Sequence, residues 1–187
     1  YVQTSDINMS VTDDWNSGNG MIPIEALGVD YDGNQYSISN LHINRPTMDS
    51  VGLFFGVENS NLENISIENA SITGNNEVGG IVGQIQSSNI SNSYFNGSIR
   101  ADSGGGIASQ LGGQQSTVSQ TYAYLDTVNN SIAGLVYESA GSVSNSYYVS
   151  NSSTSALINN AGFTSELYKG GDDMTGLDFQ NNWTAVD

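Results

Sequence analysis

Val78-Gly79-Gly80-Ile81-Val82-Gly83 is a short apolar box between glycines, and three further stretches of the chain share its pattern. They are Val51-Gly52-Leu53-Phe54-Phe55-Gly56, Gly104-Gly105-Gly106-Ile107-Ala108-Ser109 and Ile132-Ala133-Gly134-Leu135-Val136-Tyr137, at spacings of 27, 26 and 28 residues. A period of this length, made of strand-forming and turn residues, is typical of a solenoid whose coils bury their apolar side only against the next coil.

A second repeat lies out of phase with the boxes and supports the same period. Its copies begin at a β-branched residue or Leu, and their third position carries a carboxamide: Asn40, Asn64, Asn92, Gln120 and Asn145. Stacked strands would place these side chains about 4.8 Å apart, where each amide can donate to one neighbour and accept from the other. We therefore expect a carboxamide ladder along the solenoid axis.

Together the repeats predict an all-β chain that forms a right-handed parallel β-helix, or β-solenoid, of about five rungs with N- and C-terminal capping segments. We expect one domain over 1–187. Residues 1–49 contain one copy of the second repeat and no box, which predicts an opening coil or cap, and 50–160 form the repeat body. Residues 161–187 depart from the repeat and are expected to cap the other end, with one helical turn at 164–169.

The net charge of −16 reflects a shortage of cations, since 19 Asp and Glu stand against 3 Lys and Arg. So few positive charges neutralise few phosphates, which argues against nucleic-acid and anionic-lipid partners. The chain has no Cys, so disulfides, thiol catalysis and thiolate metal sites are excluded. No stretch approaches the roughly 20 apolar residues of a membrane span, so no membrane insertion is predicted.

One short stretch has the character of a metal loop. Asp30, Asp32 and Asn34 place oxygen ligands on alternate residues beside Gly33, as at the start of a calcium loop. The Glu that would complete an EF-hand loop is Leu41 here, so a plain turn is the alternative. Calcium at these three residues is the only cofactor that the sequence suggests.

Eight Asn residues lie in the N-x-Ser/Thr pattern of glycosylation acceptors. A chain so rich in Asn and Ser contains most of these patterns by chance. Asn96, Asn129 and Asn151 fall at expected corners and are the better candidates.

Two sets of side chains have a structural and a functional interpretation. Tyr94, Tyr122 and Tyr147 align in one column, which predicts packing along the solenoid, while a solvent-facing platform for sugar rings is the alternative. The single His42 lies opposite Leu41 and Ile43 in a period-two pattern, so we expect it at the surface.

The second box and the run 89–94 resemble the GLUG repeat of bacterial surface proteins and large adhesins. The segments 5–10, 23–24 and 31–41 are similar to the part that usually precedes these repeats, and 174–179 with Trp183 to the part that follows. The resemblance implies a parallel β-helix-like solenoid in an exported adhesive or surface-layer protein. It supplies no catalytic residues. The third box departs from the pattern at Gly104 and Ser109, which predicts the loosest rung.

We therefore predict a non-catalytic structural or adhesive module, extracellular or on the cell surface, that belongs to a longer exported protein. Its expected partners are further copies of itself, joined end to end in a fibre, or a surface glycan or protein. The alternative is a polysaccharide-binding or polysaccharide-degrading β-helix protein. Glycosidases need paired carboxylates, however, and Glu63 is the only acid in the second column of the ladder.

Overall fold

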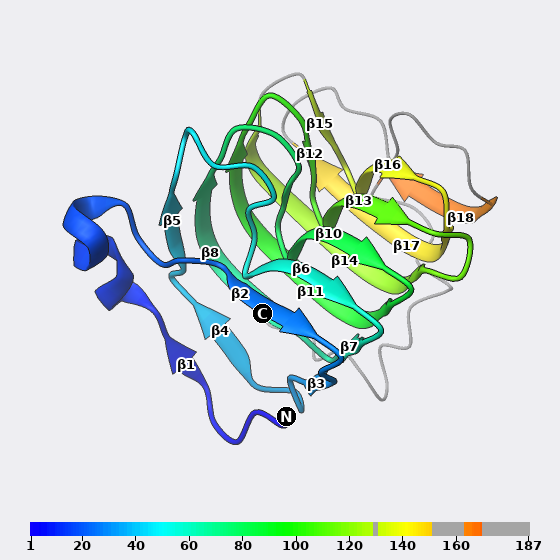
Figure 1. The fold of residues 1–187 in the computed structure, drawn as a ribbon, viewed down its shortest axis with the longest axis horizontal. Coiled ribbons are helices and arrows are strands. Elements are labelled where there is room, and N and C mark those ends of the chain that lie inside the picture. Colours follow the sequence, from blue (N-terminus) through cyan, green and yellow to red (C-terminus); the bar gives the residue numbers. More distant parts are fainter. Residues whose placement is uncertain (129–130, 151–162, 170–187) are drawn as a thin grey trace.

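The computed structural model describes residues 1–128, 131–150 and 163–169. Its strands form three parallel sheets, and successive coils of the chain stack on one another, as Figure 1 shows. The predicted all-β solenoid is therefore confirmed. The five strands of the second sheet mark about five rungs. Among the described residues, no helix combines the length and the apolar character that crossing a bilayer would require.

The three sheets, here named A, B and C, share the strands as follows. Sheet A contains β1 (Ile7–Asn8), β3 (Tyr31–Asp32), β4 (Ser37–Ser39), β5 (His42–Asn44), β7 (Asn61–Glu63), β8 (Ser66–Thr73), β11 (Asn89–Arg100), β14 (Thr117–Val128), β17 (Ser142–Ser150) and β18 (Phe163–Lys169). Sheet B contains β2 (Ile24–Leu27), β6 (Phe54–Glu58), β10 (Val82–Gln86), β13 (Ala108–Gly112) and β16 (Val136–Ser139). Sheet C contains β9 (Val78–Gly79), β12 (Gly104–Gly105) and β15 (Ile132–Ala133).

The core follows from period-two alternation in these strands. In sheet B the inward residues Val57, Ile85 and Leu111 stack on one another and are at most 2% exposed, while their chain neighbours face solvent. In sheet A the residues Phe95 and Ala123 form an equivalent buried column. Stacking like side chains at the same place in each coil produces one continuous dry interior.

The glycines of the boxes allow sheets A and C to approach each other. A Cβ on Gly80 would lie 2.5 Å from Cγ of the Phe95 ring, and a Cβ on Gly134 would overlap the ring of Tyr148. The box and the second repeat are therefore complementary on these rungs, because Phe95 and Tyr148 of sheet A occupy space that Gly80 and Gly134 leave open.

Boxes two to four stack in the predicted register, with Val82 beside Ala108 and Ala108 beside Val136. The first box is shifted, because Phe54 rather than Phe55 pairs with Val82. Gly56 therefore lies across from Gln84, not from Gly83 as the sequence alignment predicts. The shift arises because the second box has one more residue between its two strand segments than the first box has.

The register of the first coil also differs from the prediction. Asn40 was expected beside Asn64, but Ser39 pairs with Glu68, so Asn40 lies next to Asn69. Asp32 pairs with Glu63, which places Gly33 next to Asn64. The first coil is longer than the others and contains similar short motifs at two places. The sequence alignment therefore matched Asn64 to the motif at Asn40 instead of to the segment at Gly33.

The segment 164–169 was expected to form a helical turn, and this prediction is wrong. Residues Phe163–Lys169 form β18, which pairs in parallel with β17 and places Tyr168 beside Tyr147. The open backbone edge of β17 offers hydrogen bonds that outweigh a weak local helix signal. The remainder of the predicted C-terminal cap lies outside the described residues.

Residues 1–49 contribute more than a cap. They supply β2 to sheet B and β1, β3, β4 and β5 to sheet A, so they form a coil of their own. Between β1 and β2 the chain forms the kinked 3-10 helix η1 (Ser10–Gly18), the dark blue coil that projects beside the first strands in Figure 1.

Candidate functional site

The carboxamide residues of the second repeat all adopt a left-handed backbone conformation. The φ angles of Asn40, Asn64, Asn92, Gln120 and Asn145 lie between 46° and 58°. Asn tolerates this region better than other residues with a side chain, because its short polar group can bond to the local backbone. Backbone conformation thus explains the recurrence of Asn here, a reason that the stacking argument missed.

Two of these five side chains donate to acidic or amide oxygens of the first coil. Asn64 donates from Nδ2 to Oδ1 of Asp32 at 2.9 Å, and Asn40 donates to Oδ1 of Asn8 at 3.1 Å. Oδ1 of Asn92 is buried without a hydrogen-bond partner. Asn64, Asn92, Gln120 and Asn145 do occupy equivalent positions on successive rungs, as the pairs on either side of each of them show.

A continuous ladder of side-chain hydrogen bonds lies in a neighbouring column that sequence reasoning overlooked. Asn61 donates to Oδ1 of Asp30 at 3.1 Å, and Asn89 donates to Oδ1 of Asn61 at 2.9 Å. Thr117 then donates to Oδ1 of Asn89 at 2.7 Å. The signal that could have revealed this ladder is the polar residue directly before the first apolar residue of each copy.

The three calcium candidates lie in the first coil, and the carboxylates of two of them accept hydrogen bonds from backbone N–H groups. Oδ1 of Asp32 accepts the backbone N–H of Asn34 at 2.7 Å, and Oδ1 of Asp30 accepts that of Asn61 at 2.7 Å. Asn34 is exposed and donates to the carbonyl of Gln3. Within the part of the chain that the structure describes, no group of three His, Cys, Asp or Glu residues could hold a metal ion. Calcium binding here stays a prediction.

The glycosylation candidates stay predictions as well. Asn96 lies inside β11 rather than at a corner, and its Oδ1 atom is buried without a hydrogen-bond partner. Asn129 and Asn151 lie outside the described residues. His42 points out of the solenoid and is half-buried, with Nδ1 3.8 Å from Oδ1 of Asp13 in η1.

The tyrosine column lies on the outer face of sheet A. The rings of Tyr94 and Tyr122 stack with centroids 5.6 Å apart and an angle of 15° between their planes, and both are half-buried. Tyr147, the next residue of the column, is fully buried. Burial raises the pKa of Tyr94 to about 12, against a smaller lowering effect from its hydrogen bond with Asn96. Burial also raises the pKa of Tyr122.

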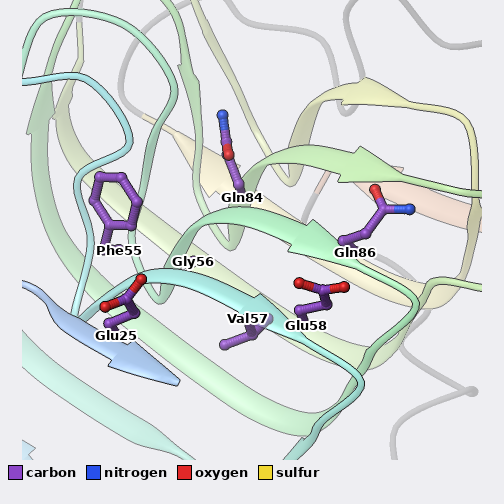
Figure 2. A pocket seen from close by; sticks show the side chains of 7 residues that line it. All are labelled: Glu25, Phe55, Gly56, Val57, Glu58, Gln84 and Gln86. Atoms are coloured by element: carbon purple, nitrogen blue, oxygen red, sulfur yellow. The ribbon is translucent and has the colours of Figure 1, made fainter. Parts of the chain in front are cut away.

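The outer face of sheet B carries a hollow. Its lining comes from three successive strands, β2, β6 and β10, and consists of Glu25, Phe55, Gly56, Val57, Glu58, Gln84 and Gln86. Figure 2 shows Glu25 and Phe55 at one end and Glu58 with Gln86 at the other, with Gly56 between them. This arrangement of an aromatic ring with carboxylates and carboxamides can bind a polar ligand that has a small apolar face.

Gly56 creates this hollow, although its backbone does not require glycine. A Cβ on Gly56 would meet only the carbonyl oxygen of Gln84 at 3.8 Å, an ordinary contact. By contrast, a Cβ on Gly52 or Gly83 would come within 2.9 or 2.6 Å of backbone atoms. The same outward column carries Glu25, Gln84, Gln110 and Glu138 on the other rungs. Among the described strands of sheet B, Gly56 is thus the one position of this column without a side chain.

Comparison with known proteins adds two findings. A family model described as the GLUG motif matches residues 74–100, which cover β9, β10 and β11. The chain is also 42% identical over 93 residues to a protein named halomucin from Haloquadratum walsbyi (strain DSM 16790 / HBSQ001). This similarity covers 44% of the chain and about 1% of the length of halomucin. No solved structure matches the chain.

Proposed function

This chain carries the GLUG motif within a β-solenoid, and we propose that it serves as a non-catalytic structural and adhesive module of an exported microbial surface protein. The proposal is supported by the partial similarity to halomucin, a far longer protein than this chain. A module that contributes a short section of a long surface protein needs stability and length rather than a reaction centre.

The observation that carries the proposal is the way in which the coils stack. Inward residues such as Ile67, Ile90 and Phe95 are fully buried, so the sheets are closely packed against the core, and outward residues form rows along the axis. Each added rung lengthens such a body by about 4.8 Å and repeats the same outward positions. Rows of equivalent side chains on a stiff support are suited to the display of a binding surface.

Cell-surface labelling tests the location. Antibodies against residues 1–150 should label intact cells that express the natural protein, and brief protease treatment of those cells should abolish the signal. A cytoplasmic enzyme serves as the control that protease must leave intact. Labelling only after cell lysis would overturn the proposed location.

Adhesion and the absence of catalysis need separate assays. Cells that lack the segment 50–150 should attach less to their natural surface than parental cells do, with the amount of surface protein matched between strains. The purified module should release no reducing sugar from neutral or acidic glycans. Sustained release that depends on the module would favour the polysaccharide-degrading alternative.

A specific observation favours assembly of the module with further copies of itself. Among the described residues, the large apolar side chains with substantial exposure all lie within the first 24 residues: Tyr1, Val2, Ile7, Val11, Trp15, Ile22 and Ile24. Strands β1 and β2 are the first strands of sheets A and B, so this apolar surface surrounds one end of the stack. A neighbouring copy that docks there would continue the sheets in an open, head-to-tail manner.

Sedimentation velocity tests this assembly. The weight-average mass should rise with protein concentration, and Ile22→Lys, at a side chain that is 60% exposed, should shift the protein toward the monomer. Gln110→Lys on the outer face of sheet B is the matched control and should leave assembly unchanged. A monomer at every concentration would contradict the proposal.

A further inference from the structure

We propose that the hollow on the outer face of sheet B binds a neutral sugar residue of a glycan. This inference rests on the proposed adhesive function and names the class of ligand. The site consists of Phe55 and Gly56 on β6, flanked by Glu25 on β2 and by Glu58, Gln84 and Gln86.

The shape of the hollow results from a single side chain that is absent. Glu25 pairs with Gly56, and Gly56 pairs with Gln84, so the outward side chains on either side of the gap stand two strands apart. Two strand spacings amount to about 9.6 Å. The missing side chain leaves a floor of backbone between polar walls, and the geometry of Gly56 offers no backbone reason for its absence.

The chemistry of the walls matches the hydroxyl groups of a sugar. The exposed carboxylate of Glu58 accepts hydrogen bonds, and the carboxamide of Gln86 both donates and accepts. Gln84 donates from Nε2 to Oε2 of Glu77 and offers its side-chain oxygen as an acceptor. Planar groups of this kind can bond two adjacent hydroxyls at once. Phe55 is half-buried and presents part of its ring beside the gap, where the apolar C–H face of a sugar ring can pack.

The charges at the hollow select against an acidic ligand. Its lining contains two carboxylates and no Lys, Arg or His. Arg45, one of three basic residues in the chain, donates instead to the carbonyl oxygens of Met21 and Gly20. A uronate or sulfated sugar would therefore meet two negative charges without a partner, whereas a neutral sugar would meet only acceptors and donors.

Ligand-observed NMR on the purified module, with fluorescence titration of any sugar that binds, tests the inference. The probes are neutral tetrasaccharides of glucose, mannose and galactose, with a tetragalacturonate as the acidic comparison. Saturation transfer should appear with at least one neutral sugar and not with the acidic one. Gly56→Gln fills the gap and should weaken that binding at least about tenfold.

Controls separate a lost site from a lost fold. Tyr137→Ala truncates an aromatic residue in the same column as Phe55, three strands away, and should leave affinity unchanged. Phe55→Ala should weaken binding and offers a second test if Gly56→Gln does not fold, with circular dichroism as the check of folding. The inference is overturned if no neutral sugar binds, or if binding survives both Gly56→Gln and Phe55→Ala.

Two further results would also overturn it: stronger binding of the acidic sugar, and saturation of the hollow by Ca²⁺ alone. Failure of the inference is distinguishable from failure of the proposed function. Surface labelling and cell attachment that persist in the Gly56→Gln strain would leave the adhesive module in place and remove only this ligand class.

Discussion

At the scale of single residues, glycine has two distinct roles in this chain. Gly80 is required by packing, since any side chain would enter the Phe95 ring and the backbone of the next rung. Gly56 stands in open space on the outer face of sheet B. The sequence aligns Gly56 with Gly83, another tightly packed glycine, and only the register of β6 and β10 shows that these two positions differ.

This difference predicts opposite effects of the same substitution. Gly80→Ala should lower the free energy of unfolding by about 2 kcal/mol or more, because it overfills a packed core. Gly56→Ala should raise it by about 0.5 kcal/mol, because a strand residue with a side chain loses less chain entropy on folding. Urea denaturation of the two variants measures both values. Equal destabilisation by both would show that Gly56 is also required by packing.

A second residue-scale prediction separates capping from calcium binding at Asp32. If its role is to accept the N–H of Asn34, Asp32→Asn keeps an acceptor and should be nearly neutral, whereas Asp32→Ala should cost about 1 kcal/mol. Under that role, a chelator should leave the melting temperature unchanged. A fall in melting temperature with chelator, lost in Asp32→Asn, would instead support the calcium prediction.

The pKa of Tyr94 leads to a prediction for alkaline pH. Burial raises its pKa from 10.0 to about 12 in the folded protein, so between these values the unfolded chain releases a proton that the folded chain retains. The contribution of Tyr94 to the free energy of unfolding should therefore be constant below pH 10 and fall as the pH rises toward 12. Urea denaturation at a series of pH values measures this fall, and Tyr94→Phe should reduce it. An unchanged slope in the variant would assign the effect to other groups.

At the scale of elements, the long strands β8, β11, β14 and β17 of sheet A each bend at a left-handed residue, and hydroxyl groups accept backbone N–H groups near the bends. Ser93 accepts the backbone N–H of Ile65 at 3.2 Å, and Ser146 accepts that of Thr121 at 3.2 Å. A similar column leads into sheet A, where Ser88 accepts the N–H of Ser60 at 3.0 Å. In each case the hydroxyl lies one rung above the donor, so the bends of successive rungs depend on one another.

Removal of one hydroxyl should therefore destabilise the fold. Ser93→Ala leaves the buried N–H of Ile65 without this partner and should lower the free energy of unfolding by about 1 to 3 kcal/mol. Ser71→Ala, at an exposed position on β8, is the matched control and should change it little. Equal unfolding midpoints for the two variants would contradict a stabilising role for the hydroxyl column.

The elements also show how far sequence reasoning extends. Three of the four boxes stack as predicted, because fixed apolar positions leave one register that buries them. Asn40 was assigned to the wrong column because the alignment relied on a motif of three residues, while the true partner of Asn64 is Gly33 in a longer coil. The hollow beside Gly56 could not be predicted, since it depends on a register shift of one residue.

At the scale of the whole molecule, charge repulsion opposes a fold that hydrophobic stacking supports. The net charge is −16, with only three basic residues to balance it. Salt screens interactions between exposed charges, because the screening length falls from about 30 Å at 0.01 M to about 3 Å at 1 M. The folded state holds these charges closer together than the unfolded chain does, so it should gain more from screening.

We therefore expect the melting temperature to rise by about 4 °C or more between 0.01 M and 1 M NaCl, which corresponds to about 1 kcal/mol at this chain length. Differential scanning calorimetry measures the shift. A variant in which the exposed residues Asp14, Asp102 and Glu138 are changed to Asn or Gln should show a smaller rise. A melting temperature that is independent of salt in both proteins would contradict the argument.

The sequence by itself determined the architecture of this protein, because a period of about 27 residues with apolar positions in phase can be buried only by stacking coil on coil. It also determined the acidic surface and the absence of cysteine chemistry. Tertiary structure alone decided which residues share a column, since coils of unequal length shift the register by amounts that no local motif records. For the same reason it alone decided that Gly56 faces solvent between Glu25 and Gln84, and the proposed ligand site depends on that position.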